Sequence, residues 1–169
     1  MMGRFKTEFE RAWVQSASKV RAYMFCVCGN WADADDLLQD CYLRALRGWG
    51  RFNGRASRQA WLFGIAKRTY ADWLRRKRRE GVVVRSENLD RFSEVVFGKP
   101  NTNQIEKVWD TIKALRVEQR EVIHLRFAAG LSYAEIAQTL GIPIGTVRSR
   151  LHRGLRAIRE QIKGQKNGT

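Results

Sequence analysis

Three polar side chains that share one face of a predicted helix, Asp36, Gln39 and Asp40, are the first candidates for chemistry. They belong to residues 30–40, which hold four carboxylates and no cation in a chain with 32 Lys and Arg residues. Paired carboxylates can perform acid–base catalysis, but no nucleophile or metal-ligating histidine accompanies them. An acidic patch on a basic protein instead predicts a docking site for a second, basic protein.

The cysteines and histidines do not predict a metal or redox centre. Cys26, Cys28 and Cys41 form no Cys-x-x-Cys pair, and both histidines, His124 and His152, lie far away in the sequence. Two residues at i and i+2 point to different sides of a helix, and this spacing is wrong for a closed zinc site. We expect reduced, partly buried thiols, no metal and no cofactor.

Residues 48–57 form a predicted Gly-rich loop that also carries aromatic and basic side chains. Phe52 is the better aromatic candidate for contacting a nucleic-acid base, because it lies in the loop. Ser57 is expected to cap a long helix that runs from Arg58 to about Arg79. Aromatic side chains beside cations favour binding to DNA with bases stacked or captured.

The first half of that helix is apolar on most sides, and Trp61, Phe63 and Trp73 are expected in the core rather than beneath a base. Its cations are Lys67, Arg68 and the run Arg75–Arg79. A cationic helix end is often simply solvated, since positive charge is favourable there. Beside the aromatic loop, however, the run predicts contacts to a DNA backbone.

Residues 131–159 predict two helices joined by a tight turn. Ser132 and Glu135 have the spacing of a capping box, Gly141 stands where a helix commonly ends, and Pro143 is tolerated at the start of the next helix. This combination favours a helix-turn-helix over a simple amphipathic hairpin.

The second of these helices has an apolar stripe and a basic face. The expected buried residues are Ile144, Val147, Leu151, Leu155, Ile158 and Ile162. The other side carries Ser149, His152, Arg153 and Arg156, flanked by Arg148 and Arg150. Such a face is typical of a helix that enters the DNA major groove.

Bulk properties agree with a nucleic-acid partner. The chain has 169 residues, a net charge of +15 and a pI of about 10.6, which favour binding to a polyanion. A hydrophobic content of 44% is enough for packed cores. No signal peptide or membrane-spanning segment is evident, so we expect a soluble, cytoplasmic protein that does not insert into a membrane.

The periodicity predicts an all-α fold of two small helical domains joined by a linker. The expected domains are residues 1–80 and 103–163, with a linker at 81–102. Asp33 is expected to cap the second helix. Further helices are expected from about Asn103 to Leu115 and from Val117 to Ala128. The first helix is marked by Phe5, Phe9, Ala12, Trp13, Ser16, Val20, Met24 and Val27, and ends near Gly29 and Asn30.

The order of these motifs resembles that of bacterial extracytoplasmic-function (group 4) sigma factors. The motifs are DADDLLQD at 33–40, FNGRASRQAWLFGIAKR at 52–68, WLRRKRR at 73–79, LRVEQREVIHLRF at 115–127 and the helix-turn-helix that begins GLSYAEIA at 130–137. The resemblance implies regions 2 and 4 of that family and a non-catalytic role. Its implied partners are core RNA polymerase, promoter DNA and an anti-sigma factor.

The resemblance also implies roles for individual residues. Asp36, Gln39 and Asp40 match positions that dock on the polymerase clamp helices. The positions implied for the −10 element are Phe52, Asn53, Gly54, Arg55, Ser57, Ile65, Lys67, Arg68, Arg75 and Arg76. Those implied for the −35 element are Thr146, Arg148, Ser149, His152, Arg153 and Arg156. Arg68 stands where Asn is usual, Ala60 where Ser or Thr is common, and His152 where an aromatic can occur.

Two other classes of function remain to be compared. A free-standing helix-turn-helix regulator would use the same DNA-binding hairpin but would not need the acidic face at Asp36. A nucleic-acid-processing enzyme is disfavoured, because the sequence shows no metal cluster, phosphate-binding loop or paired nucleophile and base.

Overall fold

The computed structural model describes residues 2–82, 111–112 and 114–164, and its regular elements in those ranges are all helical. The elements are α1 (Met2–Cys28), α2 (Trp31–Gly48), η1 (Trp49–Arg51), α3 (Arg58–Arg79), α6 (Val117–Ile123), η3 (His124–Ala128), α7 (Tyr133–Leu140) and α8 (Ile144–Gly164). The all-α prediction is confirmed. The linker expected at 81–102 and most of the helix expected from Asn103 lie outside the described residues, so the domain boundaries stay predictions.

Local sequence signals set most of the helix ends. Ser57 caps α3 by accepting a hydrogen bond from the Ala60 amide at 3.1 Å. Ser132 and Glu135 form the expected capping box at the start of α7. The same helix ends at Gly141, whose φ of 65° is in the left-handed region that glycine adopts cheaply.

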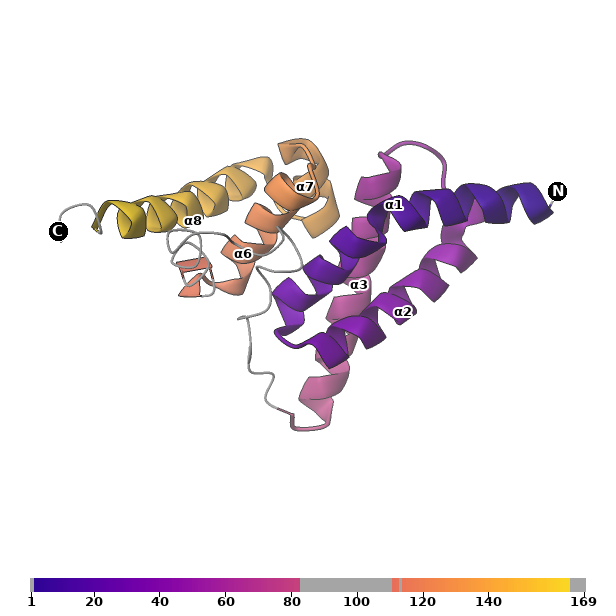
Figure 1. Ribbon diagram of the computed structural model, residues 1–169, viewed down its shortest axis with the longest axis horizontal. Helices are drawn as coiled ribbons and strands as arrows, with labels where there is room; N and C mark the ends of the chain where they lie inside the picture. The colour runs from indigo at the N-terminus through magenta and orange to yellow at the C-terminus, as the bar shows by residue number, and fades with distance from the viewer. Residues whose placement is uncertain (1, 83–110, 113, 165–169) are drawn as a thin grey trace, which may run out of the picture.

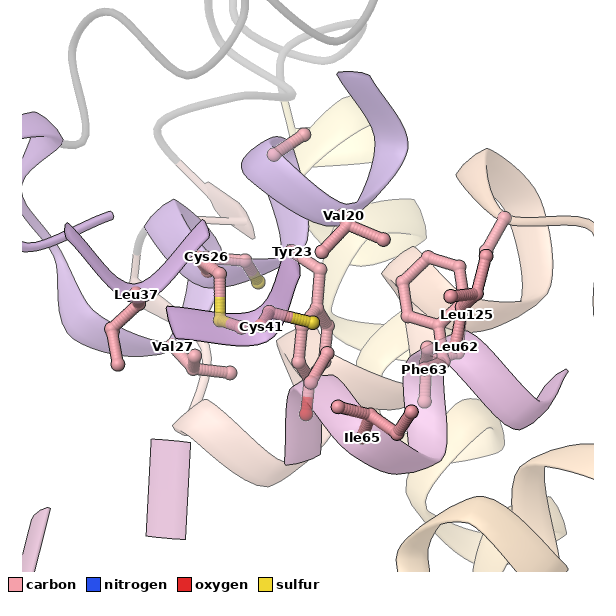
Figure 2. Close-up of a cluster of buried hydrophobic side chains, with 14 of the residues drawn as sticks. Val20, Tyr23, Cys26, Val27, Leu37, Cys41, Leu62, Phe63, Ile65 and Leu125 are labelled. Carbon is pink, nitrogen blue, oxygen red and sulfur yellow. The ribbon is translucent and has the colours of Figure 1, made fainter. Parts of the chain in front are cut away.

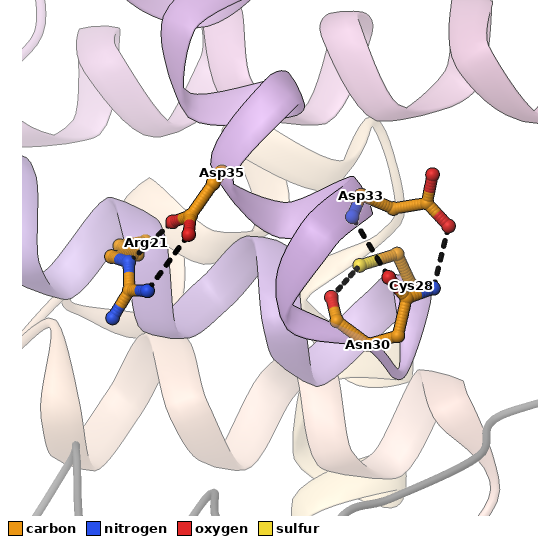
Figure 3. A network of polar contacts seen from close by, with 5 residues as sticks. All are labelled: Arg21, Cys28, Asn30, Asp33 and Asp35. Carbon is orange, nitrogen blue, oxygen red and sulfur yellow. Dashed lines mark hydrogen bonds and ion pairs between the residues drawn. The ribbon is translucent and has the colours of Figure 1, made fainter.

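Two local predictions need correction. Asn30, not Asp33, caps α2, because its Oδ1 lies immediately before the helix and accepts a hydrogen bond from the Asp33 amide at 2.8 Å (Figure 3). The helix expected over Val117–Ala128 also changes character at His124, where a π-helical turn begins. The Ala129 amide donates to the His124 carbonyl across five residues at 3.0 Å, which widens that turn.

Helices α1, α2 and α3 pack around one apolar core. Tyr23 and Phe63 are fully buried and meet edge to face, with ring centroids 5.5 Å apart. Figure 2 shows this cluster continuing from Leu37 and Cys41 to Leu125 of the C-terminal half. The core positions predicted for Phe63 and Trp73 are confirmed, since 0% and 4% of these residues are exposed.

Helices α6, α7 and α8 form the helix-turn-helix half. Val147 and Leu151 are buried as predicted, but Ile144 is 42% exposed. Because helix side chains point toward the N-terminus, the first residue of α8 points past the end of its own helix. Gly154 is also buried, and a Cβ there would lie 2.7 Å from Ile123 Cδ1, so glycine permits the close approach of α8 to α6.

The two halves lie against each other, with the N-terminus of α1 and the C-terminus of α8 at opposite ends of the long axis (Figure 1). Helix α3 contacts α7, and α1 contacts α6 and η3. Buried Glu121 accepts hydrogen bonds from Tyr23 Oη at 2.6 Å and Lys67 Nζ at 2.8 Å. His124 Nε2–H donates to the Lys19 carbonyl at 3.2 Å. No local sequence pattern predicts these contacts between the halves.

His124 predicts a pH dependence of stability. Burial lowers the pKa of His124 from 6.5 to about 4, against a smaller opposing effect of the Lys19 carbonyl. The folded protein therefore binds this proton less readily than the unfolded chain. The stability that this histidine contributes is complete above pH 6.5 and is lost as the pH falls toward 4.

We expect about 2 kcal/mol of unfolding free energy to be lost between pH 7 and pH 5 through this group. Denaturant titrations of the wild type and of His124→Gln at both pH values measure it, and the variant should lose most of the difference. His152→Gln is the matched control, because that side chain is exposed. An undiminished difference in His124→Gln would contradict the prediction.

Candidate polymerase and nucleic-acid interfaces

The face of α2 that carries Asp36, Gln39 and Asp40 is exposed. The helix buries its opposite side through Ala34, Leu37, Cys41 and Ala45. Asp36 and Asp40 make no ion pair with any residue in the described part of the chain. The structure therefore presents these three side chains together, available to a partner.

The other two carboxylates of this segment have structural partners (Figure 3). Asp35 accepts two hydrogen bonds from Arg21, at 2.5 and 2.9 Å, and these bonds hold the pKa of Asp35 below its usual range. Asp33 accepts from Asn30 Nδ2 at 2.5 Å and lies 3.9 Å from Lys77 Nζ. The acidic segment thus divides into carboxylates that stabilise the fold and carboxylates that face solvent.

Leu43 extends the exposed face of α2. It is 45% exposed. It lies three and four residues after Asp40 and Gln39, which is the spacing of one helix face. Leu46 is also 37% exposed. The candidate docking surface therefore has an apolar part that periodicity did not reveal.

A cleft of about 470 Å³ lies between α2, η1 and α3. Its lining residues are Arg44, Gly48, Arg51, Trp61, Ile65, Arg68, Ala71, Asp72 and Arg75. Three of the residues predicted for the −10 element, Ile65, Arg68 and Arg75, are thus brought together. The sequence did not indicate that Arg44, Arg51 and Asp72 would join them, because they come from different turns and elements.

One aromatic ring, that of Trp61, lines the cleft. Trp61, expected in the core, is only half-buried and lines the cleft instead. Phe52 is half-buried as well, with its ring stacked on Trp49 at 5.5 Å and tilted against Trp61 at 5.5 Å. The loop aromatic Phe52 therefore packs against Trp61, and Trp61 is the ring that lines the cleft.

The charge of the cleft is positive. Asp72 accepts from Arg44 at 2.5 Å and is also bonded to Arg75, and the Arg44 hydrogen bond is the largest cause of its lowered pKa. Arg51 and Arg68 are exposed and form no ion pair within the described ranges. An apolar wall and free guanidinium groups can together hold a base and its phosphates.

The loop beside the cleft is shaped by short local contacts. Asn53 Oδ1 accepts a hydrogen bond from the Arg55 amide at 3.1 Å, and Gly54 has a φ of 72°. Arg55 is exposed. Ser57 caps α3 and also donates its hydroxyl to Glu135 Oε1 of α7 at 2.5 Å, which is the largest cause of the lowered pKa of Glu135.

Seven of the ten residues predicted for the −10 element do not line the cleft. Five of them belong to the loop beside it, namely Phe52, Asn53, Gly54, Arg55 and Ser57, and the other two lie on α3. Lys67 lies on another side of α3, where its ammonium group pairs with Glu121 at 2.8 Å. Arg76 is exposed but is not among the lining residues.

Helix α8 exposes the predicted basic face. Arg148, His152, Arg153 and Arg156 are all exposed. Thr146 and Ser149 are half-buried, and Ser149 Oγ donates to the Thr146 carbonyl at 3.0 Å. Among the described residues, the only ion pair of this face joins Arg156 Nε to Glu160 Oε1 at 3.5 Å. The helix can therefore present several cations to one groove.

The three cysteines are free and buried. Burial raises the pKa of Cys26 and Cys41 to about 12 and that of Cys28 to about 11. The described residues contain no cluster of three metal-ligating side chains. Nor does any described helix have the length and apolarity needed to cross a membrane.

Comparisons with known proteins identify both halves. Residues 13–80 match the model of sigma-70 region 2, and residues 105–158 match that of sigma-70 region 4. The chain is 33% identical over 156 residues to the ECF RNA polymerase sigma factor SigC of Mycobacterium tuberculosis, covering 92% of this chain and 82% of that protein. It is 29% identical over 158 residues to SigW of Bacillus subtilis, covering 86% and 84%.

Solved structures of sigma factors also resemble this chain. The sigma factor RpoE in complex with the anti-sigma factor NepR from Bartonella quintana matches with a TM-score of 0.74 and 26% identity, over 92% of this chain and 97% of that chain. CnrH in complex with the cytosolic domain of CnrY shares the fold, with a TM-score of 0.67 and 20% identity over 94% and 90%. The chain therefore belongs to the extracytoplasmic-function RNA polymerase sigma factors.

Proposed function

We propose that this sigma factor docks on core RNA polymerase through the exposed face of α2, captures a −10 base in the α2–α3 cleft and recognises the −35 element with α8. The observation that carries the proposal is the presence of two oppositely charged surfaces on α2 and α3. One is an acidic face with free carboxylates, and the other is a cationic cleft with an aromatic wall.

The α2 face supports docking on a basic protein. Asp36 and Asp40 are exposed, and their neighbours Asp33 and Asp35 are already neutralised by partners of this chain. Leu43 adds apolar contact area next to these charges. Charges surrounding an apolar contact give a protein interface its orientation and part of its affinity.

The cleft supports capture of a base from an opened strand. Taking a base out of the stack costs a few kcal/mol, and a preformed pocket offsets that cost. Trp61 and Ile65 offer apolar surface to the face of a base, while Arg51 and Arg68 offer donors to its edge or to phosphates. In duplex DNA the faces of the bases are stacked and not exposed, so the cleft favours single-stranded DNA.

The proposed role is non-catalytic, and three partners are proposed. They are core RNA polymerase at its clamp helices, promoter DNA, and an anti-sigma factor of the kind that accompanies the structurally similar RpoE. The alternative, a free-standing regulator, would have no binding partner for the exposed acidic face of α2.

Sequencing of transcripts made by purified core polymerase with this protein tests the function. We expect start sites preceded by two shared sequence blocks that are absent with core enzyme alone. Tight binding to a duplex operator by the protein alone, without new transcripts, would favour the regulator instead.

Asp40→Arg is expected to abolish binding to core polymerase, because it places a cation where a basic surface docks. Pull-down with core enzyme measures binding, and circular dichroism checks the fold. Glu10→Arg makes the same charge change at an exposed position of α1 and should bind normally. Retained binding by Asp40→Arg would refute the docking face.

Arg153→Ala is expected to lose −35-dependent initiation, with a cost of about 1–3 kcal/mol for a base contact. Transcription from templates with intact and scrambled −35 blocks measures the selectivity. Arg159→Ala removes an exposed cation later in the same helix and serves as the control. The assignment fails if Arg153→Ala discriminates between the templates as well as the wild type does.

Arg68→Asn is expected to change the preferred base at the captured −10 position. Arginine carries only donors and pairs best with the acceptors of guanine, a contact that discriminates by about 1–3 kcal/mol. Transcription from templates carrying each of the four bases there measures the preference, with Arg79→Asn as the control. An identical preference in Arg68→Asn and the wild type would remove Arg68 from the cleft's recognition role.

A further inference from the structure

One face of α3 runs along the cleft and changes from apolar to charged. The residues of α3 on that face are Trp61, Ile65, Arg68, Asp72 and Arg75, at the spacing of one helix face. At a rise of about 1.5 Å per residue, Ile65 and Asp72 lie about 10 Å apart along the helix. A purine base and its hydrogen bonds can span such a distance. The charged end of the cleft is therefore within reach of the edge of a base that packs on the apolar end.

Within the described part of the chain, Asp72 is the only carboxylate that lines the cleft, beside four arginines. Its Oδ2 accepts a hydrogen bond from Arg44 of α2 at 2.5 Å, and its Oδ1 accepts one from Arg75. These partners hold the pKa of Asp72 below its usual range, so the group is ionised at neutral pH. A carboxylate has about four acceptor positions, and each oxygen therefore retains one for a ligand.

Asp72 also determines which arginines are available to phosphates. It pairs with Arg44 and Arg75, whereas Arg51 and Arg68 form no ion pair in the described ranges. A phosphate close to Asp72 would be repelled by its charge, and discrimination between ligands commonly uses a repulsive element of this kind. A base edge that carries N–H donors would be attracted to the same place. The charged end of the cleft is thus selective for a base edge over a phosphate.

Guanine is the base whose hydrogen-bonding groups match this end of the cleft. Its N1–H and its amino group are adjacent donors, which a carboxylate can accept with two oxygens. Its O6 and N7 are adjacent acceptors, which the fork of an arginine such as Arg68 can contact. Adenine, cytosine and thymine have no pair of adjacent donor groups. Both edges of a base are accessible in an unpaired strand.

We propose that Asp72 is a specificity-determining residue of the cleft, which favours guanine in an unpaired strand by accepting hydrogen bonds from its N1–H and amino group. The proposal rests on the proposed function, because it takes the cleft as the site that holds a −10 base. Arg44 and Arg75 act through Asp72 as positioning residues, since they hold its two oxygens from two different helices or turns.

Inosine isolates the contact, because it is guanosine without the amino group. The probes are fluorescein-labelled strands of about 12 nucleotides, all thymidine except for one central deoxyguanosine or deoxyinosine. Fluorescence anisotropy measures their affinity for the full chain. The wild type should bind the guanine strand about fivefold or more tightly than the inosine strand, which is the lower limit for a good base contact.

Asp72→Asn should lose most of this ratio, because an amide has one acceptor oxygen and places a donor opposite N1–H. Its affinity for the inosine strand should rise, since two arginines become available to phosphates. A merely structural role would not raise affinity while selectivity falls. Glu80→Gln is the matched control, because it removes the same charge from the exposed residue that follows α3, and it should keep the wild-type ratio.

Arg44→Gln is the second variant, and it decides the outcome if Asp72→Asn does not fold by circular dichroism. It keeps the carboxylate of Asp72 but removes the partner on α2, so the ratio should fall in part. Arg44 and Asp72 have side chains 41% and 40% exposed, and exposed ion pairs contribute little to stability. The proposal is overturned if the wild type does not prefer the guanine strand, or if the folded variants keep the wild-type ratio.

A second series with core polymerase separates this proposal from the proposed function. Core enzyme should raise the affinity of the wild type for both strands and leave the preference for guanine in place. If core enzyme does not bind the wild type, the proposed function fails, while the ratio between the guanine and inosine strands still reports on Asp72.

Discussion

Helix α3 contributes side chains to the core, to the cleft and to the contact with the helix-turn-helix half, and the rest of the molecule is arranged around it. Leu62 and Phe63 face the core, Ile65 and Arg68 line the cleft, and Lys67 faces the helix-turn-helix half. Because residues three or four apart share a helix face while neighbours do not, one helix can carry all three surfaces. Its cap at Ser57 also donates a hydrogen bond to Glu135 of the helix-turn-helix half.

Features that depend on neighbours within four residues could be predicted from the sequence. The cap at Ser57, the capping box of Ser132 and Glu135, and the turn at Gly141 all follow from local hydrogen-bonding rules and appear as expected. The exposed acidic face of α2 was also predictable, since carboxylates without a local role are conspicuous in a basic chain.

Features that depend on partners distant in the sequence could not be predicted in this way. Lys67 and Glu121 are separated by 54 positions, and with 32 Lys and Arg residues no pattern says which cation a given carboxylate meets. Trp61, expected in the core, faces the cleft, and the apolar Leu43 faces solvent, because neighbouring helices cover α2 and α3 only in part. Their exposure depends on the packing of the neighbouring helices, and it is what gives them a role in the candidate interfaces.

The proposed function requires that the two halves bind one promoter together with core polymerase and that the −10 element then opens. Permanganate footprinting on a promoter found for this protein, with core enzyme and sigma factor added singly and together, measures this opening. We expect reactive, unpaired thymines in the −10 element only when both proteins are present, and loss of that reactivity when the −35 block is scrambled. Protection of fully paired DNA by the sigma factor alone, without unpaired bases when core enzyme is added, would contradict it.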